Sequence, residues 1–236
     1  MELIREIAFD TETTGLDWAG EDRVIELGAV ELVNHVPTGK TFRTLINPGR
    51  PVSDDTIRIT GITDEMLVDK PTFDSANVVD AFLDFVGDAT LVAHNAAFDR
   101  GFLNAELKRC GRAIIEEPRW VDTVALAKKR FPGAPASLDA LCKRFDVSLE
   151  SRTFHGALLD AQLLAAVYLE LLGGRARAFD FSGPAARAAV KSGPARQRPV
   201  PLPSALSAEE SDRHAAHLAH LSDTPIWKKY LAGSDV

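Results

Sequence analysis

Short runs of alternating or consecutive apolar residues open the chain and predict β-strands. The runs cover residues 3–10, 24–33, 41–46 and 90–93, and they are rich in Val, Ile, Phe and Thr, residue types that favour strands. The first three runs follow one another closely, as the strands of a meander do. The pattern therefore predicts a sheet that is built early in the chain.

Later segments carry apolar residues at helical spacing. Within residues 74–86, for example, Val78, Phe82 and Phe85 fall on one helix face. The same spacing predicts further helices over 99–110, 121–130, 137–145 and 157–172. Strands precede helices in this order, so the fold class we expect is α/β, a mixed β-sheet flanked by helices.

The composition changes after residue 174. The next stretch holds Pro, Gly, Ser and Ala with scattered positive charges and no apolar period, which predicts a flexible linker. Ser207 and Glu210 have the spacing of a capping box and predict a helix through Leu221. The expected organisation is a domain over 1–174, a linker over 175–205 and a C-terminal segment over 206–236.

Aromatic residues in these last two parts suggest partner binding. Trp227 and Tyr230 lie in a terminus too small to form its own core, and such segments usually dock on a partner. Phe179 and Phe181 lie in the linker sequence ARAFDF, residues 176–181. They either bind a partner or pack back on the domain.

Composition and charge limit the class of protein. The chain has 236 residues, of which 45% are hydrophobic, and this is enough for one domain of ordinary size with an appendage. A net charge of -7 argues against a broad basic face that coats duplex nucleic acid. The N-terminus lacks a signal-peptide pattern and no 18-residue apolar run occurs, so we expect a cytoplasmic protein that does not span a membrane.

Candidate chemistry is concentrated in three short motifs that are far apart in the chain. Asp10 and Glu12 lie in FDTETTG, Asp99 in HNAAFDRGF, and His155 with Asp160 in HGALLDA. Asp10 and Glu12 are two residues apart at the end of a buried strand, so both side chains emerge on one face of the sheet. Four clustered acids are unstable unless divalent cations neutralise them, which predicts a two-metal nuclease site.

His155 and Asp160 are five residues apart. On one helix their side chains would diverge by about 140°. We therefore expect His155 on the loop before the helix, bent back toward Asp160. His94 either faces the substrate or simply ends a buried strand, and Asn95 is a candidate helix cap.

The three motifs, with SLDALCKRF before the last of them, resemble those of the DEDDh 3′→5′ exonucleases. Within that family the closest resemblance is to the epsilon-type proofreading subunits of bacterial DNA polymerase III. It is strong over about the first 174 residues and weak in the tail. It implies an RNase H-like fold, two Mg²⁺ or Mn²⁺ ions, and release of 5′-monophosphates from a 3′ end. By matched position it implies metal-site acids at Asp10, Glu12, Asp99 and Asp160, with His155 as the general base.

Substrate contacts are expected near the same motifs. The turn from Thr13 to Gly15 lets backbone N–H groups approach the terminal nucleotide closely. Phe98 or Phe102 stacks on its base, unless their spacing of four residues on a helix reflects core packing. Asp55 and Thr60 stand where better-known family members carry a Glu and a His near the substrate, which puts contacts there in doubt.

The resemblance also implies partners. The C-terminal segment resembles the tail that anchors epsilon to the polymerase (alpha) subunit, and residues 176–181 resemble a sliding-clamp motif without its glutamine. The expected function is a proofreading exonuclease subunit acting on a frayed 3′ end of DNA, without homo-oligomerisation. The alternatives are a free-standing RNA exonuclease of the RNase T or oligoribonuclease kind, and a mainly structural subunit that braces polymerase and clamp. The intact acid set favours the enzyme.

Overall fold

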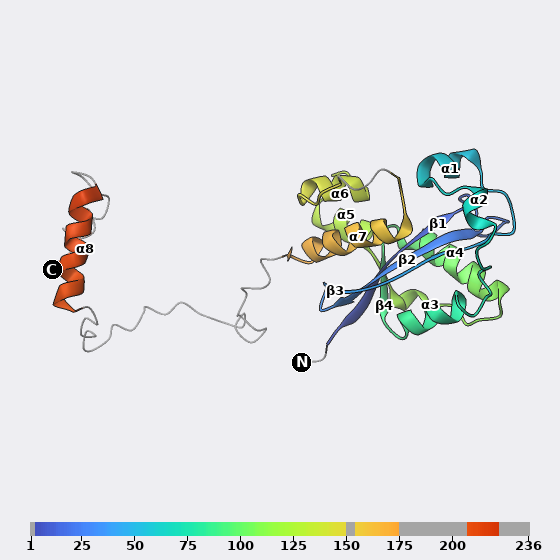
Figure 1. Cartoon of the computed structure of the whole chain (residues 1–236), viewed down its shortest axis with the longest axis horizontal. Helices are drawn as coiled ribbons and strands as arrows, with labels where there is room; N and C mark the ends of the chain where they lie inside the picture. The colour runs from blue at the N-terminus through green and yellow to red at the C-terminus, as the bar shows by residue number, and fades with distance from the viewer. Residues whose placement is uncertain (1–2, 150–153, 175–206, 222–236) are drawn as a thin grey trace. The chain divides into compact units, whose positions relative to one another are not determined.

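The computed structural model describes residues 3–149, 154–174 and 207–221 (Figure 1). The chain divides into two units, Met1–Phe181 and Ser182–Val236. The predicted linker over 175–205 lies outside the described residues, as do the predicted partner-binding aromatics Phe179, Phe181, Trp227 and Tyr230. Within the described ranges, every helix is too short or too polar to cross a membrane.

A five-stranded mixed sheet in the order β3-β2-β1-β4-β5 forms the centre of the first unit. Its strands are β1 (Arg5–Thr13), β2 (Val24–Val33), β3 (Val36–Leu45), β4 (Thr90–Ala93) and β5 (Trp120–Asp122). The β1-β2 and β2-β3 pairs are antiparallel, and the β1-β4 and β4-β5 pairs are parallel. β1 is thus the central strand, and neighbours on both sides hold its backbone.

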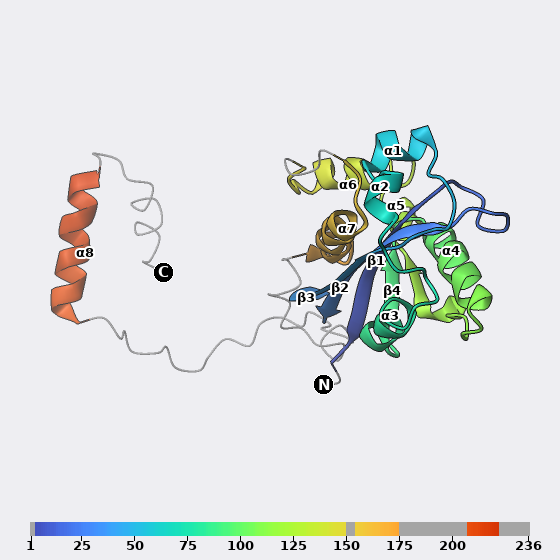
Figure 2. The ribbon, with the colours of Figure 1, turned by 45° about the vertical axis from the view of Figure 1, so that its right-hand side comes forward.

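Helices cover both faces of this sheet (Figures 1 and 2). The helices of the first unit are α1 (Asp54–Thr60), α2 (Asp64–Leu67), α3 (Val79–Val86), α4 (Ala96–Arg109), α5 (Thr123–Arg130), α6 (Leu138–Arg144) and α7 (Ala157–Leu171), with a 3-10 turn at Glu117–Arg119. Ile7 and Phe9 of β1 enter the core shared with α3 and α4, whereas Ala8 enters the core shared with α5, α6 and α7. The unbroken apolar start of β1 thus serves two cores, because successive strand residues point to opposite faces.

The third strand is longer than predicted. β3 begins at Val36 rather than at residue 41, because Asn34 and His35 adopt positive φ angles of 51° and 69° and form a tight hairpin turn after β2. The first half of β3 is exposed at the edge of the sheet. Because this half of β3 is exposed, its sequence shows no alternation of apolar and polar residues.

The helix predicted over 121–130 begins with a strand instead. Residues Trp120–Asp122 pair with β4 as β5, and α5 starts only at Thr123, where the Asp122 side chain accepts the N–H of Val124 at 2.9 Å. A three-residue strand carries no period of its own, so tertiary pairing decides it. Similarly, α1 and α2 were not predicted, and α3 begins at Val79 rather than at residue 74.

The second unit contains the described helix α8 (Ala208–Leu221). Its predicted capping box is confirmed: Ser207 Oγ accepts the Glu210 N–H at 3.2 Å, and Glu210 Oε2 accepts the Ser207 N–H at 2.9 Å. The reciprocal bonds satisfy two backbone donors at the start of the helix.

Candidate active site

Three of the predicted acids converge in space. Asp10 and Glu12 lie on β1, Asp160 lies in the first turn of α7, and one carboxylate oxygen from each falls within 4.8 Å of the others. Asp10 and Glu12 share the sheet face on which α7 packs, as their spacing predicted. Three hard oxygen donors at this separation suit a divalent cation such as Mg²⁺ or Mn²⁺.

A glycine in β2 allows α7 to come this close to the sheet. Gly28 pairs with Asp10 across the β1-β2 ladder, and a Cβ added to Gly28 would lie 2.1 Å from the carbonyl carbon of Ala157 and 2.2 Å from the amide nitrogen of Leu158. The backbone of α7 therefore occupies the space of a side chain. Sequence reasoning missed Gly28, although a glycine inside a long apolar strand is a signal of close backbone approach.

A buried glutamate fixes the start of the same helix. Glu26, with a side chain only 1% exposed, accepts the N–H of Ala157 at 2.9 Å through Oε2 and pairs with Arg43 at 2.5 Å through Oε1. It satisfies one of the helix N–H groups that lack an intrahelical partner. Sequence reasoning also missed this residue, whose signal is a charge inside the apolar run of β2.

His155 lies on the loop before α7, as its spacing from Asp160 predicted. Its Nδ1 is 3.2 Å from Asp160 Oδ2, and its backbone N–H donates to the carbonyl of Ile59 at 3.1 Å. An ionised carboxylate can only accept, so Nδ1 is the donor in this contact, and in the neutral tautomer that fits it the lone pair is on Nε2. Nε2 is thus the atom that can accept a proton from water.

Asp99 lies apart from the other acids. It is buried on α4, and its Oδ1 accepts the N–H and the hydroxyl of Thr11 at 3.0 and 2.8 Å. Because α4 covers the sheet face opposite α7, Asp99 meets β1 from the Thr11 side, and it is not one of the three acids whose oxygens lie within 4.8 Å of one another. Burial raises the pKa of Asp99 to about 7. The hydrogen bonds from Thr11 lower this pKa, but their effect is smaller than that of burial.

A cleft of about 610 Å³ opens beside the three acids. Asp10, Asp160, His155 and His94 line it, together with Lys128, and its volume is in the range of small-molecule sites. His94 Nδ1 lies 2.9 Å from Thr123 Oγ1. Burial lowers the pKa of His94, which favours a neutral ring on the cleft wall.

Comparison with known proteins shows the family to which the chain belongs. Residues 7–168 match the family model described as "Exonuclease". The DNA polymerase III subunit epsilon of Rickettsia felis is 50% identical over 182 residues, covering 76% of this chain and 79% of that one. The chain belongs to the epsilon family of exonucleases. The epsilon subunit of Escherichia coli is 46% identical over 189 residues, covering 77% of each chain.

Solved structures agree with the RNase H-like exonuclease fold predicted for this family. Exonuclease X in complex with 5′ overhanging duplex DNA superposes with a TM-score of 0.55 at 29% identity, covering 72% of this chain and 90% of that one. The nuclease domain of 3′hExo, a DEDDh family member bound to rAMP, has a TM-score of 0.59 at 20% identity, covering 72% and 91% of the two chains. The second likeness supports the fold alone.

Two of the residues considered as substrate contacts, Phe102 and Thr60, are buried. Phe102 is fully buried in the core, so core packing, the alternative that its helical spacing left open, applies to it. Phe98 is half-buried against it, at 4.9 Å between ring centroids. Thr60 is buried, and its hydroxyl donates to the carbonyl of Thr56 at 2.9 Å. It does not present that hydroxyl to the cleft.

The remaining predicted contacts have different surroundings. Asp55 is exposed on α1 and pairs with Arg58 at 2.7 Å. The side chain of Thr13 is buried and donates to the carbonyl of Gly15 at 2.6 Å, which closes the turn after β1. Asn95 begins α4 with a positive φ of 68° and makes no side-chain cap; instead its N–H donates to Asp122 at 3.1 Å.

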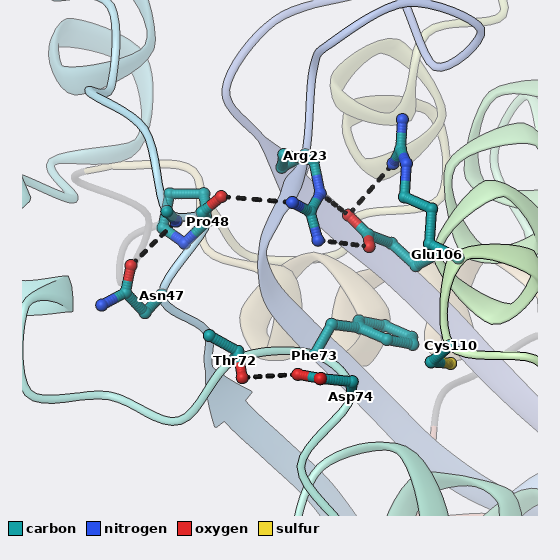
Figure 3. Close-up of a pocket in the computed structure, with 10 residues that line it drawn as sticks. Arg23, Asn47, Pro48, Thr72, Phe73, Asp74, Glu106 and Cys110 are labelled. Carbon is teal, nitrogen blue, oxygen red and sulfur yellow. Dashed lines mark hydrogen bonds and ion pairs between the residues drawn. The ribbon is translucent and has the colours of Figure 1, made fainter.

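A second pocket shows how the loop after β1 is anchored (Figure 3). Arg23 Nε and Nη2 lie 2.7 and 2.8 Å from the two carboxylate oxygens of Glu106, whose side chain is 1% exposed. This hydrogen bond to Glu106 is the main cause that raises the pKa of Arg23. The two-pronged pair fastens the loop to α4, so we assign this pocket of about 290 Å³ a structural role.

Proposed function

We propose that this epsilon-family exonuclease removes mispaired 3′-terminal nucleotides from DNA, releasing 5′-monophosphates as the proofreading subunit of DNA polymerase III. The observation that supports this most directly is the convergence of Asp10, Glu12 and Asp160 within 4.8 Å beside the cleft. A clustered set of acids is costly without cations. This cost disfavours the alternative of a purely structural subunit.

The residues divide the chemistry among them. Asp10, Glu12 and Asp160 would hold two divalent cations, Mg²⁺ or Mn²⁺, which would supply positive charge to stabilise a phosphodiester under attack. His155 accepts the proton of the attacking water at Nε2, because Asp160 holds its Nδ1. Asp99 holds the β1 backbone at Thr11 and so helps to fix the direction of the neighbouring acids.

The test is digestion of a primer with a mismatched 3′ end. Purified protein should release 5′-monophosphates with Mg²⁺ or Mn²⁺, and chelation should stop the release. Asp10→Asn should abolish it while the protein stays folded. Asp88→Asn, at an exposed loop position, is the matched control and should retain wild-type activity.

Two results would contradict the proposal. Digestion that continues in the presence of chelator would exclude metal-assisted hydrolysis. A strong preference for an RNA strand over the DNA primer would favour the alternative of a free-standing RNA exonuclease.

The proposed partners are engaged outside the exonuclease domain. We expect residues 206–236 to bind the polymerase (alpha) subunit and residues 176–181 to bind the sliding clamp, in the cytoplasm at the replisome. The relatives named as DNA polymerase III subunits support association with such a polymerase complex. Truncation after residue 174 should leave nuclease activity on single strands within two-fold of wild type and remove co-purification with the polymerase subunit. Retained co-purification would show that the exonuclease domain itself carries the contact.

A further inference from the structure

A groove of about 620 Å³ lies between the loop after β1 and helix α4. We call it the Trp18 groove. Trp18 of the loop forms one wall, and Arg100, Gly101, Lys108 and Arg109 of α4 contribute to the other. Its described lining includes three cations and no acid, in a chain whose net charge is -7. Arg100 and Arg109 each have an acidic neighbour outside this lining, Glu117 at 3.1 Å and Glu106 at 3.4 Å, and Lys108 adds a further positive charge that suits an anionic ligand.

Trp18 is an exposed aromatic that is held in place. Its side chain is 46% exposed, and a Cβ added to Gly101 would lie 2.8 Å from the indole ring. The absence of a side chain at Gly101 thus lets the indole lie against the backbone of α4. A flat ring that is partly exposed in this way is a stacking surface for a base.

The three cations of the groove differ in how free they are to pair with a phosphate. Arg109 donates to the carbonyl of Gly20 at 2.9 Å and so holds the loop to α4. Lys108 is exposed, and Arg100, whose side chain is 28% exposed, is paired at 3.1 Å with Glu117, whose side chain is 79% exposed. A pair with one partner this exposed contributes little, so a phosphate can compete with Glu117 for Arg100. Eight residues separate the two cations along α4, about 12 Å at 1.5 Å per residue, which spans roughly three phosphates of a strand.

The Trp18 groove approaches the active site at the start of α4, where Asn95 lines the cleft and Ala97 lines the groove. The loop leaves β1 directly after Glu12 and Thr13, and Arg100 and Gly101 follow Asp99, whose carboxylate is bonded to Thr11 of β1. A strand whose 3′ end occupies the cleft can therefore continue into the groove.

We propose that the Trp18 groove binds the single-stranded part of the substrate 5′ to the scissile nucleotide, with a base stacked on Trp18 and phosphates paired with Arg100 and Lys108. The inference rests on the proposed nuclease function, and it specifies the path that the substrate strand takes across the protein surface. It predicts that affinity grows with strand length until the groove is filled. A mononucleotide ester fills only the cleft and should be insensitive to the groove.

The test compares two substrates on the full-length protein, a ten-nucleotide DNA single strand and the p-nitrophenyl ester of thymidine 5′-monophosphate. Trp18→Ala should raise KM for the single strand about 5- to 150-fold, the range expected for loss of one stacked base, with little change in kcat. Trp18→Phe should retain most of the affinity. Both variants should hydrolyse the ester within two-fold of wild type.

Charge is tested separately. The double variant Arg100→Gln with Lys108→Gln should lower the slope of log affinity against log salt by about 1.4 for the single strand, since each phosphate contact contributes about 0.7. Lys143→Gln removes an exposed cation on α6, on the opposite face of the sheet, and should leave the slope unchanged. Anisotropy of a fluorescent strand without divalent cation measures this binding even if no hydrolysis occurs, so failure of the groove and failure of the nuclease assignment are distinguishable.

Three outcomes would overturn the inference. Unchanged single-strand KM and salt slope in the groove variants would show that the strand takes another path. An equal rise of KM for the ester would show that Trp18 acts by shaping the cleft. Loss of binding to the polymerase subunit with unchanged strand affinity would make the groove a protein interface.

Discussion

Gly28→Ala should separate the acids of the active site without removing any of them. The added Cβ would lie 2.1 Å from the carbonyl carbon of Ala157, whereas ordinary contacts begin near 3.4 Å. The first turn of α7 must therefore move by about 1.3 Å, the difference between these distances. Asp160 moves with it, away from Asp10 and Glu12.

Two magnitudes follow from this displacement. Forcing one extra methyl group into a packed contact costs about 1–3 kcal/mol of unfolding free energy. A misplacement of about 1 Å in a reacting constellation lowers the rate about 10²-fold. We therefore expect a folded Gly28→Ala protein with kcat reduced about 10²-fold and weakened Mn²⁺ binding.

The assay is nucleotide release from a single strand, with thermal unfolding and Mn²⁺ titration measured on the same preparations. Gly156→Ala is the matched control, because its Cβ would lie 3.8 Å from the nearest atom, Glu26 Oε2, and its φ of -151° suits alanine. It adds the same methyl group next to α7 without a clash. A Gly28→Ala protein with wild-type kcat and Mn²⁺ affinity would refute the argument that close approach at Gly28 positions Asp160.

Two further predictions concern other parts of the domain. His155→Ala should lower kcat about 10²- to 10⁴-fold, as loss of a general base does, with little change in Mn²⁺ affinity; a titration that instead matches Asp160→Ala would identify His155 as a ligand. The hydrogen bonds from Arg5 and then Thr38 lower the pKa of Glu31 to about 2 from an ordinary 4.5, so the unfolded state binds the proton more tightly. Glu31→Gln should therefore lower the unfolding free energy by about 1–2 kcal/mol at pH 7, and its difference from wild type should shrink as pH falls from about 4.5 toward 2. A difference that stays constant over this window in urea titrations would contradict the ion-pair explanation.

The sequence by itself determined the local features that depend on period and spacing. Alternation along a strand placed Asp10 and Glu12 on one face, and the angular step of a helix placed His155 on the loop before Asp160. The capping box at Ser207 was likewise readable, because its two hydrogen bonds join residues three positions apart. Each of these predictions needs only neighbours in the chain.

Tertiary structure alone decided which distant groups meet. The sequence placed Asp99 with the other acids, but α4 covers the opposite face of the sheet and brings it to Thr11. Helical spacing left Phe102 open to stacking or core packing, and burial against β1 resolved the choice. The approach of α7 to Gly28 depends on packing between elements that are far apart in the chain. Local period indicates which face a residue occupies, whereas the partner of that face depends on how all the elements pack together.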